Sequence, residues 1–239
     1  MKKLTFYLVL CCIASAGFYS CTKTGSPGNS GDNNTESAYD NSLAESINND
    51  VAAISAQSED NGVAGTYEDS VFSPALSPCA TITIDLTSTP QKLIIDFGKD
   101  NCLCYDGRYR RGKILVAYTG LYSDAGSMHT ITFDNYYVND YKVEGKHTIV
   151  NTGRNANGNL TFSVSVNSTI TDTSGRKLTY TSERTRQWLA GESTDGLFEW
   201  TDDVYSITGT AEGTAFDGTK FTSDITSALI VALNCRWMP

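Results

Sequence analysis

The sequence has little of what metal sites and membrane spans usually need. Only two of its 239 residues are histidines, His129 and His147. Zinc sites take histidine and cysteine ligands at characteristic spacings, and Cys102 and Cys104 do not have one of them. Beyond the first twenty residues, no apolar run reaches the roughly 18 residues of a membrane-spanning helix. We therefore expect no bound metal and no transmembrane helix in the body of the chain.

Catalytic motifs are equally scarce. The chain lacks a Gly-x-Ser-x-Gly elbow, although sequence order alone never excludes a Ser-His-Asp arrangement. Asp202 and Asp203 could form a carboxylate pair with Glu199 for glycosidic chemistry, but ordinary surface acids explain the same pattern. We predict that the protein is not an enzyme and uses no cofactor.

One region is rich in oxygen ligands. Asp96, Asp100, Asn101 and Asp106 lie close together, and such loops can hold calcium. The spacing of a calcium-binding EF-hand is absent, and three arginines follow within the same region. We predict a solvated turn with local ion pairs.

The first twenty residues have the pattern of a secretory signal peptide. Lys2 and Lys3 precede a mostly apolar stretch that is too short to stay in a membrane. Two processing sites compete: cleavage after Ala16, and a lipobox at Phe18–Cys21. We predict signal peptide 1–20 and attachment of fatty-acyl chains such as palmitate to Cys21, since several acyl chains hold a protein firmly on a membrane.

The segment after Cys21 favours the lipid anchor. Residues 21–41 are rich in Gly, Ser, Asn and Thr, the composition of a flexible tether. The whole chain has 18 basic and 27 acidic residues, and loss of residues 1–20 removes two lysines and no acid. The mature protein then has 16 basic and 27 acidic residues, a net charge of −11, which predicts no nucleic-acid partner.

A short helix follows the tether. Leu43, Ile47, Val51 and Ile54 recur at the spacing of one helical face. Ser42 precedes them as a capping residue, which predicts a helix over 42–58.

After the helix, the spacing of apolar residues changes to every second residue. The clearest strand runs from Leu160 to Asn167, where Leu160, Phe162, Val164 and Val166 alternate with polar residues and are expected on one buried face. Several more strands follow the same pattern between turns such as Asn157-Gly158 and Asp217-Gly218. We predict an all-β domain over 75–239, an antiparallel up-and-down meander that forms a curved sheet, an open barrel or a sandwich.

Tyrosines and tryptophans are frequent in these strands. A flat aromatic face could stack on sugars or bind a partner protein, but strand tyrosines more often pair across strands at the edge of a core. The residues concerned are Tyr118, Tyr122, Tyr136, Tyr137, Tyr141, Tyr180, Tyr205, Trp188, Trp200 and Trp237.

Five segments carry a family resemblance: 101–114 (NCLCYDGRYRRGKI), Phe133–Asn139 (FDNYYVN), Val143–Gly145, Arg184–Trp188 (RTRQW) and Cys235–Trp237 (CRW). They resemble an uncharacterised family of Gram-negative envelope lipoproteins, over most of residues 79–237. The resemblance implies a signal peptide, a lipid anchor and a β-rich body, and it implies no activity, because none is established for the family. Relatives continue past Cys-Arg-Trp through another hairpin, so we expect this chain to lack its last strands.

Four cysteines remain for disulfides once the signal peptide and the lipidated Cys21 are set aside. Exported thiols tend to pair. A hairpin of residues 80–97 would bring Cys79 beside the chain that leads to Cys102, within roughly 5 to 6 Å between Cα atoms. We predict Cys79–Cys102, with Cys79–Cys104 as the alternative, and leave Cys235 unassigned.

Three functions remain open. We expect a lipoprotein of the bacterial cell envelope, at the outer membrane, that acts as a non-enzymatic binding or structural module. Its partners would be the membrane, through the lipid, and an envelope protein or glycan. The alternatives are a carrier of an apolar ligand in an open β-barrel and a hydrolase.

Overall fold

The computed structural model describes residues 33–64, 80–194 and 202–232. Within them lie one α-helix, one short 3-10 helix and ten strands. The elements are α1 (Asn33–Ala64), β1 (Thr81–Asp85), β2 (Gln91–Asp96), β3 (Cys102–Leu103), β4 (Tyr109–Tyr118), β5 (Met128–Val138), β6 (Tyr141–Arg154), β7 (Leu160–Thr171), β8 (Lys177–Ala190), η1 (Glu192–Thr194), β9 (Val204–Thr214) and β10 (Lys220–Ala232).

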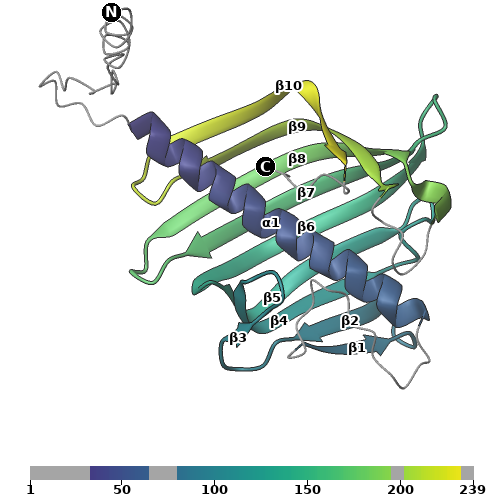
Figure 1. Cartoon of the computed structure of the whole chain (residues 1–239), viewed down its shortest axis with the longest axis horizontal. Helices are drawn as coiled ribbons and strands as arrows, with labels where there is room; N and C mark the ends of the chain where they lie inside the picture. The colour runs from purple at the N-terminus through teal and green to yellow at the C-terminus, as the bar shows by residue number, and fades with distance from the viewer. Residues whose placement is uncertain (1–32, 65–79, 195–201, 233–239) are drawn as a thin grey trace, which may run out of the picture. The chain divides into compact units, whose positions relative to one another are not determined.

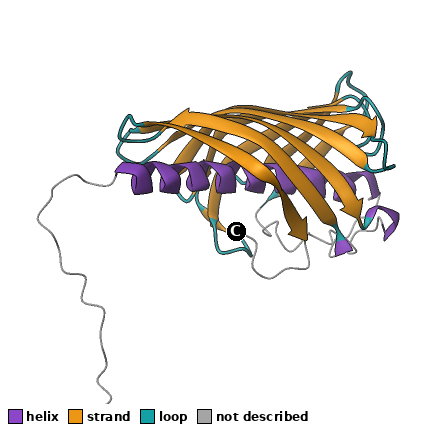
Figure 2. Ribbon diagram, turned by 90° about the horizontal axis from the view of Figure 1, so that it is seen from above, coloured by secondary structure: helices purple, strands orange, loops and turns teal. Residues whose placement is uncertain are grey.

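The strands form a single antiparallel sheet. Its order is β1-β2-β4-β5-β6-β7-β8-β9-β10, and β3 pairs with β4 beside this path. Almost every strand therefore pairs with its neighbour in sequence, and the predicted all-β meander is confirmed. The sheet is open, with β1 and β10 as its two edges. Figure 2 shows it curved around α1, which crosses one face diagonally (Figure 1). We call this face the inner face.

The strand pattern of the sequence is reproduced most clearly in β7. Leu160, Phe162 and Val166 are buried and Val164 is partly buried, as the alternation predicts. The turn glycines also lie where the sequence places them: Gly158 and Gly218 have φ of 85° and 88°, a conformation that favours glycine.

The helix is longer than the predicted 42–58. It begins at Asn33, inside the segment expected as tether, and ends at Ala64. Residues 33–41 carry few apolar side chains, so helical periodicity could not reveal them. The apolar stripe is confirmed at Ile47, Val51 and Ile54, which are buried together with Ala44. As the sole α-helix of the described ranges, α1 lacks the long apolar stretch that crossing a membrane requires.

The core lies between α1 and the inner face. The buried residues of the helix and of the strands belong to one continuous cluster, which includes Ile95, Ile114, Ile131, Phe162 and Ile170. The apolar side chains beneath the helix therefore fill a packed core.

Candidate functional site

Several predicted site residues lie outside the described part of the chain. They are Cys21, Cys79, Glu199, Trp200, Cys235 and Trp237. The lipid anchor and the pairing of Cys79 accordingly stay predictions. The β1–β2 hairpin on which the pairing was based does form, with Ile82 opposite Ile95.

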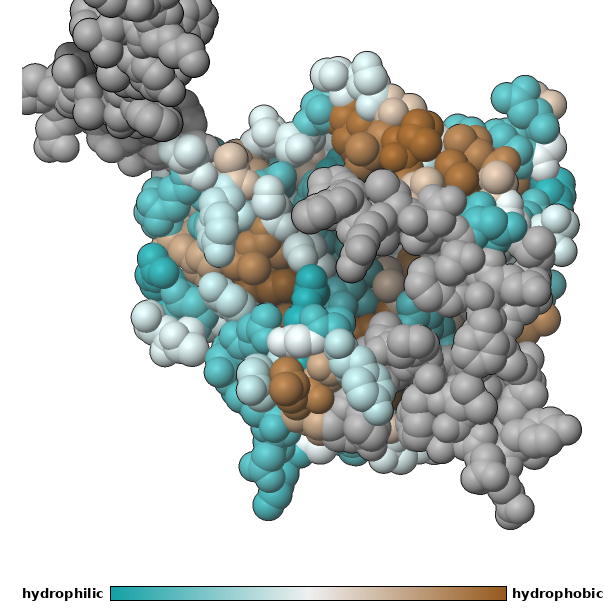
Figure 3. All heavy atoms as spheres, in the orientation of Figure 1, coloured by the Kyte–Doolittle hydropathy of each residue, from teal (hydrophilic) through white to brown (hydrophobic). Residues whose placement is uncertain are grey.

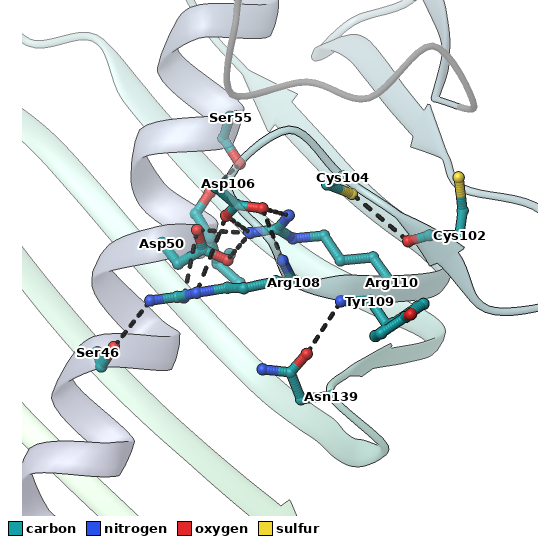
Figure 4. Close-up of polar contacts among 11 residues, drawn as sticks. Ser46, Asp50, Ser55, Cys102, Cys104, Asp106, Arg108, Tyr109, Arg110 and Asn139 are labelled. Carbon is teal, nitrogen blue, oxygen red and sulfur yellow. Dashed lines mark hydrogen bonds and ion pairs between the residues drawn. The ribbon is translucent and has the colours of Figure 1, made fainter.

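The two described cysteines differ. Cys104 has a free, buried thiol, whose Sγ lies 3.7 Å from the carbonyl oxygen of Cys102 (Figure 4). The alternative pairing through Cys104 is therefore not formed. Cys102 is disulfide-bonded, but no disulfide joins two of the described residues.

Polar side chains of α1 attach the helix to the sheet along its length. Such contacts compensate polar groups that packing removes from water. They are Asp40, which accepts from the backbone N–H of Phe216 (2.9 Å), Glu45 with Arg184 (2.7 Å), and Asn48, which donates to Ser168 (3.1 Å).

The densest of these contacts surrounds Arg110. This side chain of β4 is fully buried, and its Nη2 lies 2.8 Å from Asp50 of α1 and 2.6 Å from Asp106. Figure 4 shows Arg108 beside it, which reaches Asp50 (3.4 Å) and donates to Ser46 (3.1 Å). Burial alone would lower the pKa of Arg110, but the hydrogen bonds and charges of Asp106 and Asp50 outweigh burial and raise it.

The same contacts explain the oxygen-rich region. Burial acts to raise the pKa of Asp106, but its hydrogen bonds from Arg110 and from the backbone N–H of Arg108 lower it overall. Asp96 forms an ion pair with Lys113 (2.8 Å), and Asn101 donates a hydrogen bond to Asp140 (3.0 Å). Asp96 and Asp106 thus each have a cationic partner, in agreement with the predicted local ion pairs. No group of three potential metal ligands occurs among the described residues.

The two histidines lie on the inner face and do not share a site. His129 Nδ1 is 3.0 Å from Glu59 of α1, and the rings of Tyr118 and Tyr122 enclose it. This is the geometry of a base held by an acid, but no hydroxyl in the described ranges hydrogen-bonds to its Nε2. His147 is buried beside Phe133, and burial lowers its pKa to about 4.

A second polar centre lies in the corner of the inner face near η1. The guanidinium of Arg186 packs on three rings, with its Cζ 5.3 Å from Tyr122, 4.9 Å from Phe162 and 5.0 Å from Tyr205. It also donates to the hydroxyl of Tyr122. We call Arg186 and these three aromatic residues the arginine–aromatic cluster.

Asp203 lies at the margin of this cluster. The residue is buried and accepts hydrogen bonds from Trp188 Nε1 (3.1 Å) and from the Tyr205 hydroxyl (2.9 Å). No described carboxylate, Asp203 included, lies within ion-pair distance of Arg186. Burial lowers the pKa of Arg186, and Tyr205 and Asp203 offset this only in part.

The cluster was only partly visible in the sequence. Tyr122, Tyr205 and Trp188 were among the aromatic candidates, and Asp203 was noted for a carboxylate pair with Glu199, which lies outside the described residues. Arg186 was missed as a functional residue. Its signal was the alternation Arg184-x-Arg186-x-Trp188, which places all three side chains on the inner face.

Comparison of the chain with models of protein families, with characterised proteins and with solved structures gives no significant match.

Proposed function

We propose that the protein is a lipid-anchored module of the bacterial cell envelope, attached through Cys21 at the outer membrane, which binds an envelope protein or glycan without catalysing a reaction. The proposal follows the signal peptide, the lipobox and the resemblance to envelope lipoproteins.

One observation carries the proposal: the segment that follows the tether is itself part of the core. α1 covers the inner face, and Glu45, Asp50 and Glu59 connect it to β8, β4 and β5. A tether that continues into a helix fixed in this way holds the sheet as one body at the membrane. The sheet then presents its outer face to partners.

A carrier of an apolar ligand is the second candidate. It is favoured by the curved, open sheet, whose apolar inner face is covered by one helix. Under α1 the apolar side chains fill a packed core, so a ligand would have to bind beside the helix rather than beneath it.

The binding proposal is tested with the lipidated protein in envelope fractions. Chemical crosslinking, purification and mass spectrometry should recover the same partner, in a fixed ratio, with the wild-type chain and with a variant carrying His129→Gln and His147→Gln. Those substitutions remove the histidines on which a hydrolase would depend. Turnover of an envelope component that is lost in the histidine variant would contradict the proposal.

The disulfide Cys79–Cys102 belongs to the same proposal, because it requires an oxidising compartment. Peptide mapping without reduction should recover a crosslinked peptide that contains both residues. A peptide that joins Cys102 to Cys235 would show that the pairing is wrong.

A further inference from the structure

Arg186 differs from the other arginines that reach the inner face. Arg110 has Asp50 and Asp106, and Arg184 has Glu45 at 2.7 Å. For Arg186, the described residues provide one hydrogen-bond acceptor, the Tyr122 hydroxyl, and no carboxylate within ion-pair distance.

At least one N–H donor of Arg186 has no partner among the described residues. A guanidinium has five N–H donors. Its Nε is shielded from solvent and has no partner within the described ranges. Arg110 Nε and Arg184 Nη1 share this feature, but those two arginines each have a carboxylate partner. Aromatic rings attract a cation through their faces, but they do not accept the in-plane hydrogen bonds of the guanidinium. Asp203 is the carboxylate that acts on the pKa of Arg186, and it accepts its hydrogen bonds from Trp188 and Tyr205. A planar anion bound here would therefore meet both the positive charge of Arg186 and an N–H donor that lacks a partner.

Apolar side chains continue from Arg186 toward the edge of the sheet. Strand register places Arg186 of β8 between Phe162 of β7 and Ile207 of β9, and Ile207 beside Leu229 of β10. Residues that pair directly across antiparallel strands lie on the same face. Leu229 is 42% exposed, and Figure 3 shows hydrophobic residues gathered at the edge where β9 and β10 lie in Figure 1.

We propose that this corner binds an amphiphilic anion, a fatty acid or a related lipid, whose carboxylate or phosphate pairs with Arg186 and whose apolar chain lies along Ile207 and Leu229 toward β10. Phe162, Tyr122 and Tyr205 form the floor beneath the anionic group. The lipid site goes beyond the proposed function, because its presence does not depend on which envelope partner the module binds. It also meets the condition for a ligand beside the helix, since none of the contacts of Arg186 comes from α1.

The test uses the full chain with Cys21→Ser, so that no acyl chain of the protein itself competes for the site. Laurate, below its micellar concentration, is titrated by calorimetry. Dodecanol has the same chain without the charge, inorganic phosphate has charge without a chain, and glucuronate is an anionic sugar. We expect one laurate per chain, with each of the other three probes binding at least about tenfold more weakly.

Variants separate a binding role of Arg186 from a structural one. Arg186→Gln should weaken laurate binding by about tenfold to a hundredfold, the usual effect of losing a charge-assisted contact, and Arg186→Lys should retain part of it. Arg176→Gln is the matched control, because Arg176 also lies over a ring, Phe216, but has its own carboxylate, Asp172. It should bind laurate as the wild type does.

Three results would overturn the proposal. One is equal binding of laurate and dodecanol, or of laurate by wild type and Arg186→Gln. Another is binding of phosphate or glucuronate as tight as that of laurate, which would remove the apolar part of the ligand. The third is a lower thermal midpoint of Arg186→Gln without ligand, because a structural arginine would then explain the cluster.

Discussion

Arg110 and Arg186 lie on the same face of one sheet, and the groups around them assign them different roles. A buried cation is costly unless counter-charges and hydrogen bonds meet it. Arg110 has two carboxylates, one of them from α1, and so joins the helix to β4. Arg186 has rings and one hydroxyl, which leaves it available to a ligand.

Arg110→Met should therefore destabilise the fold strongly. The substitution leaves Asp50 and Asp106 facing each other, although Asp50 keeps Arg108 at 3.4 Å. Breaking a buried ion pair costs roughly 3 to 5 kcal/mol, and partial exposure of both carboxylates reduces this to roughly 2 to 4 kcal/mol. Urea unfolding of the two proteins measures the difference.

The control is Arg111→Met. Arg111 pairs with Asp140, which is half exposed, so the expected loss is below about 1 kcal/mol. Equal losses in the two variants would mean that the Arg110 contacts contribute no more than a surface pair.

His147 gives the fold a dependence on pH. Burial lowers its pKa from 6.5 to about 4 in the folded state, so between these values the unfolded chain binds the proton and the folded chain does not. Stability must then fall as the pH drops from about 6.5 to about 4, by at most roughly 3 kcal/mol. The pKa of Asp106 is lowered from 3.8, so loss of its contribution begins below this window.

His147→Leu places an apolar side chain at the buried position and removes the titrating group. Unfolding measured at intervals between pH 7 and pH 4 should show a flatter profile for the variant. A profile with the same slope as that of the wild type would assign the pH dependence to other groups.

At the scale of elements, β4 is bent by a glycine. Gly112 has φ of 80°, and a Cβ there would lie 1.9 Å from the carbonyl oxygen of Asn135 on β5. The β4–β5 register shifts between Arg111 and Lys113, a bulge of the kind that bends sheets.

Gly112→Ala should cost roughly 3 kcal/mol or more, because both the backbone conformation and the close approach forbid a side chain. Gly107→Ala is matched in backbone conformation, with φ of 81°, but has open space around it. Its expected cost is roughly 1 to 2 kcal/mol. Thermal unfolding of the two variants compares them, and a Gly107 variant as unstable as the Gly112 variant would refute the role of the close approach.

The sequence predicted elements well where one physical signal dominated. The alternation of Leu160 to Val166 located β7, and the stripe of Ile47, Val51 and Ile54 located the centre of α1. The hairpin at Asn139-Asp140 was missed because both residues have positive φ without being glycine, at 47° and 65°. The first turns of α1 were missed because their buried side chains are polar, as Ser37 and Asp40 show.

The candidate site was harder to predict for a different reason. The arginine–aromatic cluster brings Tyr122 from the β4–β5 loop to Phe162, Arg186 and Tyr205 on three strands. The registers of two strand pairs, β7–β8 and β8–β9, have to be known before the three strand residues can be placed together, and composition does not supply them.

At the scale of the whole molecule, charge is distributed between the layers of the fold. The chain carries a net charge of −9, and acids of α1 meet bases of the strands across the core boundary. This arrangement attaches the segment next to the tether to the sheet. The proposed role of the protein therefore requires that the tether be anchored to the membrane.

The most direct test of that claim is the mass of the N-terminal peptide from membrane-bound protein. Trypsin should release Cys21-Thr22-Lys23 carrying acyl chains, because cleavage follows Lys23. The Cys21→Ala variant should leave the membrane fraction or remain unprocessed. A mature protein that begins at Gly17, carries no acyl group and is recovered in soluble form would contradict the account.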